Sequence, residues 1–149
     1  MKYRKSVRIK GYDYKADGYY FVTICTAKRK PLLSTCKKDV EEIICDLPNK
    51  FKGIKIDFYN ILPDHIHIIF IFDGSNTTLS NVVRTLKALV TIKTKNRPFW
   101  EWNYYEHVIR NEGALYQIRK YVEENSADEK IDFKKIYSGI NATATKKIT

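Results

Sequence analysis

The chain has 149 residues, enough for one domain with a sizeable core, and its 27 Lys and Arg residues against 17 Asp and Glu residues give a net charge of +10. Such an excess favours a polyanionic partner, with nucleic acid the first candidate and a merely solvated basic surface the alternative. The sequence contains neither a run of about 18 apolar residues nor a secretory signal, and its three cysteines lack the spacing of a zinc ribbon, so we expect a cytoplasmic protein without a membrane partner.

The first ten residues form a basic segment in which positive and apolar side chains are interleaved. The side chains in it that could contact DNA phosphates are Arg4, Lys5, Arg8 and Lys10. A solvated terminus would have the same composition. Aromatic and β-branched residues from 19 to 26 then predict a first strand, which the basic residues before Pro31 bring to an end.

A first helix is predicted over residues 37–47, because apolar residues recur there at helical spacing, and Pro48 is expected to stop it. Residues 54–59 alternate between apolar and polar side chains and predict a second strand. A Pro-Asp turn at residues 63–64 leads directly into the next strand. These two strands should therefore form an antiparallel hairpin.

The third predicted strand, residues 65–72, carries two of the three histidines in the chain. His65 and His67 project from the same face of this strand, about 6.5 Å apart along it, while the opposite face is entirely apolar. Two imidazoles at this spacing can bind one cation. Two hydrogen-bonded structural histidines are the alternative, because two ligands do not complete a metal site.

Thr78 can cap a second helix, which has one apolar face and includes the basic residues Arg84 and Lys87 as possible DNA contacts. The aromatic segment 99–109 that follows is expected to contain a fourth strand. Its rings could stack on unpaired bases or could simply fill the core.

A third helix is predicted over residues 112–125, where Tyr121 and Asn125 lie one turn apart on the same side. We expect a single domain over residues 1–140 and a flexible tail over residues 141–149.

The order strand, helix, strand, strand, helix, strand, helix predicts an α+β fold, an antiparallel sheet covered by helices on a ferredoxin-like plan. A tyrosine on the last helix, such as Tyr121, can attack a phosphodiester and hold the severed strand as a phosphotyrosine. A cation bound beside it would polarise the phosphate.

Five segments together resemble the REP-associated tyrosine transposases, single-domain members of the HUH superfamily that process single-stranded DNA. The resemblance covers nearly the whole chain, and it rests on residues 8–14, 20–26, 63–67, 105–112 and 118–125.

The resemblance implies a metal-dependent endonuclease and strand transferase, a transposase that uses Mg²⁺ or Mn²⁺ and acts on single-stranded DNA beside hairpins of repetitive palindromic elements. Tyr121 would be the nucleophile and would leave a 5′-phosphotyrosine and a free 3′-hydroxyl. His65, His67 and Asn125 would be the metal ligands. A monomer and a homodimer are both compatible with this resemblance.

Two other functions fit the same residues. A non-catalytic protein that binds single-stranded nucleic acid would use the basic segments and the aromatic cluster, with structural histidines. A replication-initiator nickase would share the metal and the tyrosine but would differ in its products.

Overall fold

The computed structural model describes residues 17–124 and 133–138 of the chain. Several predictions lie outside the described residues: the domain boundary at 140, the tail 141–149, Asn125, and the basic side chains of Arg4, Lys5, Arg8 and Lys10.

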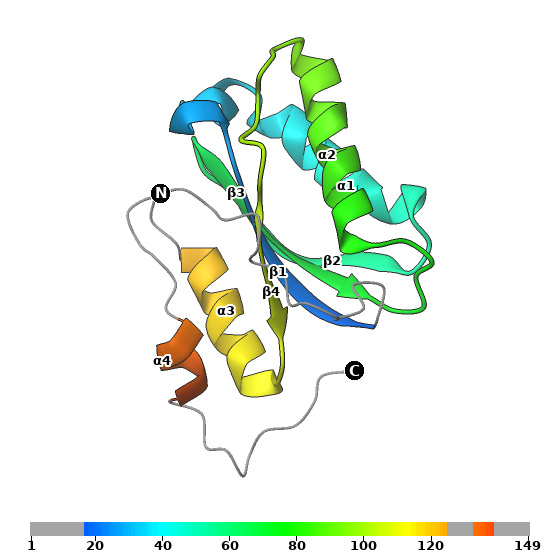
Figure 1. Ribbon diagram of the computed structural model, residues 1–149, viewed down its shortest axis with the longest axis vertical. Coiled ribbons are helices and arrows are strands. Elements are labelled where there is room, and N and C mark those ends of the chain that lie inside the picture. Colours follow the sequence, from blue (N-terminus) through cyan, green and yellow to red (C-terminus); the bar gives the residue numbers. More distant parts are fainter. Residues whose placement is uncertain (1–16, 125–132, 139–149) are drawn as a thin grey trace.

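Four antiparallel strands form one sheet in the order β2-β3-β1-β4 (Figure 1). The strands are β1 (Gly18–Cys25), β2 (Ile54–Ile61), β3 (His65–Phe72) and β4 (Tyr105–Ile109). The two central strands, β1 and β3, are buried along nearly their whole length. This strand order, with helices packed on the sheet, is that of a ferredoxin-like fold and confirms the predicted fold class.

Helices cover both faces of the sheet, as Figure 1 shows. One face carries α1 (Lys37–Lys50) and α2 (Leu79–Thr94), and the other carries α3 (Glu112–Glu124) and the short α4 (Phe133–Ser138). Two 3₁₀ turns, η1 (Ala27–Arg29) and η2 (Leu32–Thr35), connect β1 to α1. Among the described residues, no helix is long and apolar enough to span a membrane.

The alternation of side chains along β1 divides the core into two clusters. Tyr20, Val22 and Ile24 pack toward α1 and α2, whereas Phe21 packs toward α3. Because both faces are covered, the central strands are apolar on both sides, as strands in a fully buried sheet are.

The predicted hairpin of β2 and β3 is confirmed, and it contains an irregularity that the sequence did not predict. The pairing register shifts between Ile56 and Phe58. Ile56 packs with the α1 and α2 cluster, while Phe58 packs with the α3 cluster. The bulge at Asp57 therefore changes which side chains of β2 face α3.

One helical prediction was wrong in part, and one helix was missed. The first helix does not stop before Pro48 but continues to Lys50, where the Leu47 carbonyl accepts a hydrogen bond from the Phe51 amide (3.0 Å). A proline so close to the end removes only one intrahelical hydrogen bond, which the last turn tolerates. Helix α4 was not predicted at all. The cap of α2 is confirmed, because the Thr78 hydroxyl accepts from the Asn81 amide (3.1 Å).

Candidate functional site

His65 and His67 lie at the start of β3 on the face that α3 covers. Their ring centroids are 4.7 Å apart, and both side chains are buried. The same-face arrangement follows from the strand pleat, and burial on this face follows from the packing of α3 across it.

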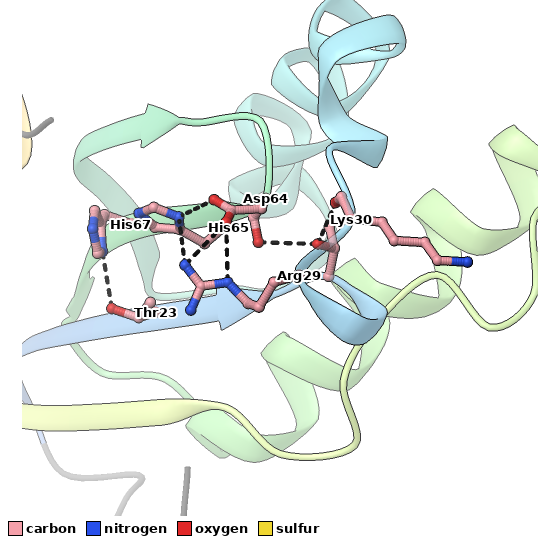
Figure 2. A network of polar contacts seen from close by, with 7 residues as sticks. Thr23, Arg29, Lys30, Asp64, His65 and His67 are labelled. Atoms are coloured by element: carbon pink, nitrogen blue, oxygen red, sulfur yellow. Dashed lines mark hydrogen bonds and ion pairs between the residues drawn. The ribbon is translucent and has the colours of Figure 1, made fainter. Parts of the chain in front are cut away.

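An ion-paired carboxylate orients His65 (Figure 2). The Nδ1 atom of His65 lies 2.7 Å from Oδ1 of Asp64, and Nε of Arg29 donates to Oδ2 of Asp64 (3.2 Å). Burial raises the pKa of Asp64, but the hydrogen bond from His65 and the charge of Arg29 outweigh it, so the pKa lies below its usual value. An ionised carboxylate only accepts hydrogen bonds, so Nδ1 of His65 carries the proton and Nε2 keeps its lone pair.

Arg29 reaches Asp64 from a strained turn. Lys28 and Arg29 have φ angles of 54° and 55°, in the left-handed region that side-chain-bearing residues rarely adopt. The turn is closed by the Arg29 amide, which donates to the Thr26 carbonyl (3.1 Å), and by the Thr26 hydroxyl, which donates to the Lys30 carbonyl (2.7 Å). From the sequence we expected only a strand end here, so Arg29 is a residue of the site that sequence reasoning missed.

His67 has one bonded and one unsatisfied ring nitrogen. Its Nδ1 lies 2.9 Å from the Thr23 hydroxyl, its neighbour across the strands, and its Nε2 is buried without a hydrogen-bond partner within the described part of the chain. Burial, together with the nearby His65 and Arg29, lowers the pKa of His67 to about 3. The ring is therefore neutral at pH 7. In the tautomer whose Nδ1–H donates to the Thr23 hydroxyl, the Nε2 lone pair is available to a cation.

Tyr121 lies on α3 against His67 of this pair. The centroid of its ring is 5.4 Å from that of His67 and 6.4 Å from that of Phe21. The structure thus brings Tyr121 and both histidines together from elements that are more than fifty residues apart in the chain.

The two neutral imidazoles fit a divalent cation as a partial ligand set. Burial is the largest cause that lowers the pKa of His65, and it outweighs the opposing hydrogen bond from Asp64, so His65 is neutral like His67. No group of three or more His, Cys, Asp or Glu side chains that could hold a metal occurs within residues 17–124 and 133–138. A further protein ligand would have to be of another type or come from outside these ranges.

The predicted DNA contacts Arg84 and Lys87 lie on α2, across the sheet from the histidines. Arg84 is exposed. The ammonium of Lys87 instead donates to the carbonyls of Glu101 (2.9 Å), Trp102 (3.2 Å) and Asn103 (3.4 Å), and burial lowers its pKa to about 8. Lys87 therefore anchors the segment before β4 to α2, a contact that its place on a basic helix did not suggest.

The aromatic segment divides between the two roles expected for it. Phe99 is buried, and the indole N–H of Trp100 donates to the Lys87 carbonyl (3.1 Å), so both contribute to the core. Trp102 has 73% of its surface exposed and is accessible to a ligand.

One family model and one curated relative match most of the chain. The family model described as IS200-like transposase matches residues 14–125. The chain is 30% identical to an uncharacterized protein of Haemophilus influenzae, in an alignment that covers 84% of this chain and 89% of that protein.

Two solved structures have a fold similar to that of this chain. One is a REP-associated tyrosine transposase bound to a REP hairpin, with a TM-score of 0.69 and 22% identity over 79% of this chain and 72% of the other. The second is a putative transposase from Deinococcus radiodurans R1, with a TM-score of 0.55 and 19% identity over 80% of this chain and 98% of the other.

Proposed function

Because the chain belongs to the family of IS200-like transposases, we propose that it cleaves and rejoins single-stranded DNA with Tyr121 as the nucleophile. The resemblance to tyrosine transposases expected from the sequence is confirmed at the level of family and fold. The observation that carries the proposal is the distance of 5.4 Å between the ring centroids of Tyr121 and the buried His67.

In the cleavage step the phenolic oxygen of Tyr121 attacks the scissile phosphorus. A bond forms between that oxygen and phosphorus, the bond from phosphorus to the 3′ oxygen breaks, and a 5′-phosphotyrosine results. The phenol gives its proton to solvent, and the departing 3′ oxygen takes one up to become a hydroxyl. Attack of a 3′-hydroxyl on the phosphotyrosine reverses these changes and joins the strands.

The residues that would hold a divalent ion are His65 and His67, each through Nε2, with Asn125 as the third protein ligand. When bound, Mg²⁺ or Mn²⁺ would polarise the phosphate and offset the charge that develops on it. Asp64 would keep the His65 ring in the tautomer that such an ion requires.

The substrate proposed is single-stranded DNA next to a hairpin, in the cytoplasm. The similar structure of a REP-associated transposase holds a REP hairpin, which supports this substrate class. The positive charge of the chain supports attraction to phosphates, to which Arg4, Lys5, Arg8, Lys10 and Arg84 would contribute.

The decisive experiment is incubation of the protein with hairpin oligonucleotides that carry single-stranded flanks, in the presence of Mn²⁺, followed by denaturing electrophoresis. We expect a protein-linked strand from the wild-type protein and none from Tyr121→Phe, which lacks only the phenolic oxygen. Tyr116→Phe is the matched control, because Tyr116 lies on the same helix and is 65% exposed; it should form the adduct normally.

An adduct formed by Tyr121→Phe at the wild-type rate would assign the chemistry to another tyrosine. Tight binding without any adduct from the wild-type protein would instead support the non-catalytic alternative, for which the exposed Trp102 is a suitable stacking surface.

A further inference from the structure

Strand β2 binds α3 through two side chains that meet the helix on either side of Tyr121. Asp57 accepts two hydrogen bonds from Arg119, from Nε to Oδ2 and from the terminal nitrogen to Oδ1, both 2.7 Å long. Asn60 donates through Nδ2 to the backbone carbonyl of Val122 (3.0 Å). The helix is thus held at Arg119, two positions before the proposed nucleophile, and at Val122, one position after it.

The β-bulge places both of these side chains on the α3 side. Beyond the register shift, Asn60 pairs with His67 across the strands, and directly paired residues of antiparallel strands share a face. The same row continues to Thr23 of β1, which binds the His67 ring. The side chain that binds the backbone next to Tyr121 is therefore the immediate neighbour of a proposed metal ligand.

The contact of Arg119 with Asp57 is directional and partly enclosed. The Asp57 side chain is only 10% exposed, and the guanidinium also lies 5.9 Å from the Tyr19 ring centroid and 5.6 Å from that of Phe58. The hydrogen bond to Asp57 raises the pKa of Arg119, which stays charged. A bidentate pair of this kind constrains orientation as well as distance, which a lysine cannot do.

The apolar contacts of α3 do not impose the same constraint. Its buried residues Ala114, Leu115, Ile118 and Val122 hold the helix against the sheet, but such packing is non-directional and compatible with small rotations or shifts. A displacement of about 1 Å of a reacting group is enough to slow a reaction by about 100-fold.

We propose that Asp57, Asn60 and Arg119 form a brace that positions Tyr121 over the histidine pair, and that they are positioning residues for strand cleavage. This proposal rests on the proposed role of Tyr121. The brace acts through the orientation of α3 and makes no contact with DNA in this role.

The test measures the single-turnover rate of adduct formation at saturating hairpin DNA, DNA affinity, and thermal unfolding for each variant. We expect Arg119→Ala and Asp57→Asn to slow adduct formation by about 10- to 100-fold and to leave the affinity within about threefold. The double variant should be no slower than either single variant, because both remove the same interaction. Arg119→Lys keeps the charge and the fold, so its slower rate would reflect the lost bidentate geometry.

Lys50→Ala is the matched control, because it removes an exposed ion pair with Asp46 (3.8 Å) on α1, away from the site. It should leave the adduct rate unchanged. Wild-type rates in Arg119→Lys, Arg119→Ala and Asp57→Asn, measured below their unfolding temperatures, would overturn the brace.

A second measurement does not depend on cleavage. Nuclear Overhauser contacts between the rings of Tyr121 and His67 should be present in the wild-type protein and weakened in Arg119→Lys and Asp57→Asn, with other core contacts kept. Unchanged contacts would contradict the brace even if the chain cleaves DNA. Absence of an adduct from the wild-type protein would instead overturn the proposed function; ring contacts sensitive to Arg119 would then support only the orienting effect of the brace on Tyr121 and not its role in cleavage.

Discussion

At the scale of single residues, the clearest indication of a ligand is Nε2 of His67, which is buried without a hydrogen-bond partner among residues 17–124 and 133–138. A buried polar atom without a hydrogen-bond partner lowers the free energy of unfolding by roughly 1–3 kcal/mol. Such an atom is retained where another interaction offsets this loss or where the atom binds a ligand. A cation would satisfy that atom, and the ring of His65, 4.7 Å away, would offer a second nitrogen.

We predict that His65→Ala and His67→Ala each reduce Mn²⁺-dependent cleavage at least about 100-fold and leave most of the DNA affinity intact. The reason is that an ion acts at the scissile phosphate, whereas general attraction comes from basic residues elsewhere. Cleavage gels and filter binding on the same preparations would check both halves of this prediction. Full cleavage by either variant in the presence of a chelator would rule out a metal at these residues.

At the scale of elements, His107 of β4 makes two contacts with α4. The ring of His107 stacks on Phe133 with 3.8 Å between centroids, and its Nε2 lies 2.8 Å from the Tyr137 hydroxyl. That hydroxyl also accepts from the Arg110 amide (3.2 Å). Phe133 in turn packs against Phe21, so α4 adjoins the same cluster that holds Tyr121.

This attachment should depend on pH. Burial, and then the charge of Arg110, lower the pKa of His107 to about 4, while the ring would titrate near its ordinary pKa of about 6.5 once α4 is released. Polar groups that act on this ring are the neutral hydroxyl of Tyr137 and the cation of Arg110. Since the folded pKa is the lower one, the contribution to docking is complete above pH 6.5 and declines by at most about 1.4 kcal/mol per pH unit as pH falls toward 4.

Hydrogen exchange of the backbone amides in residues 133–138 would measure this effect locally. Exchange should become faster, after correction for the intrinsic pH dependence, as pH falls from 7 to 5. His107→Gln can still bind Tyr137 but cannot titrate, so its corrected exchange should not change over that range. If the corrected exchange rates of the wild-type protein also do not change between pH 7 and pH 5, His107 does not control the docking of α4.

At the scale of the whole molecule, the net charge of +10 should dominate DNA affinity. Raising the salt concentration from about 50 to about 200 mM should weaken binding by about three orders of magnitude or more if about six phosphates are neutralised.

Replacing the exposed Arg84 by Ala should reduce the slope of the logarithm of affinity against the logarithm of salt concentration by about one. Lys87→Met should leave this slope unchanged, because the ammonium of Lys87 already binds three carbonyls. Fluorescence anisotropy titrations at several salt concentrations would measure these slopes, and a salt-independent affinity would contradict the prediction.

Much of the molecule followed from the sequence alone, because strands and helices are specified by local patterns. Alternation placed His65 and His67 on one face of β3, helical spacing placed Tyr121 on α3, and the order of elements predicted the α+β fold. The family resemblance was recognisable for the same reason, since its motifs are short and contiguous.

What only the tertiary structure decided concerns contacts between distant segments. The partner of Arg119 is 62 residues away on a bulged strand, and the partner of Arg29 is 35 residues away. A charged residue in a sequence with 27 Lys and Arg and 17 Asp and Glu has many possible partners, and neither hydropathy nor spacing selects among them. The partners are selected by the order of strands in the sheet and by the position of α3 across it, because this arrangement determines which side chains come within hydrogen-bonding distance.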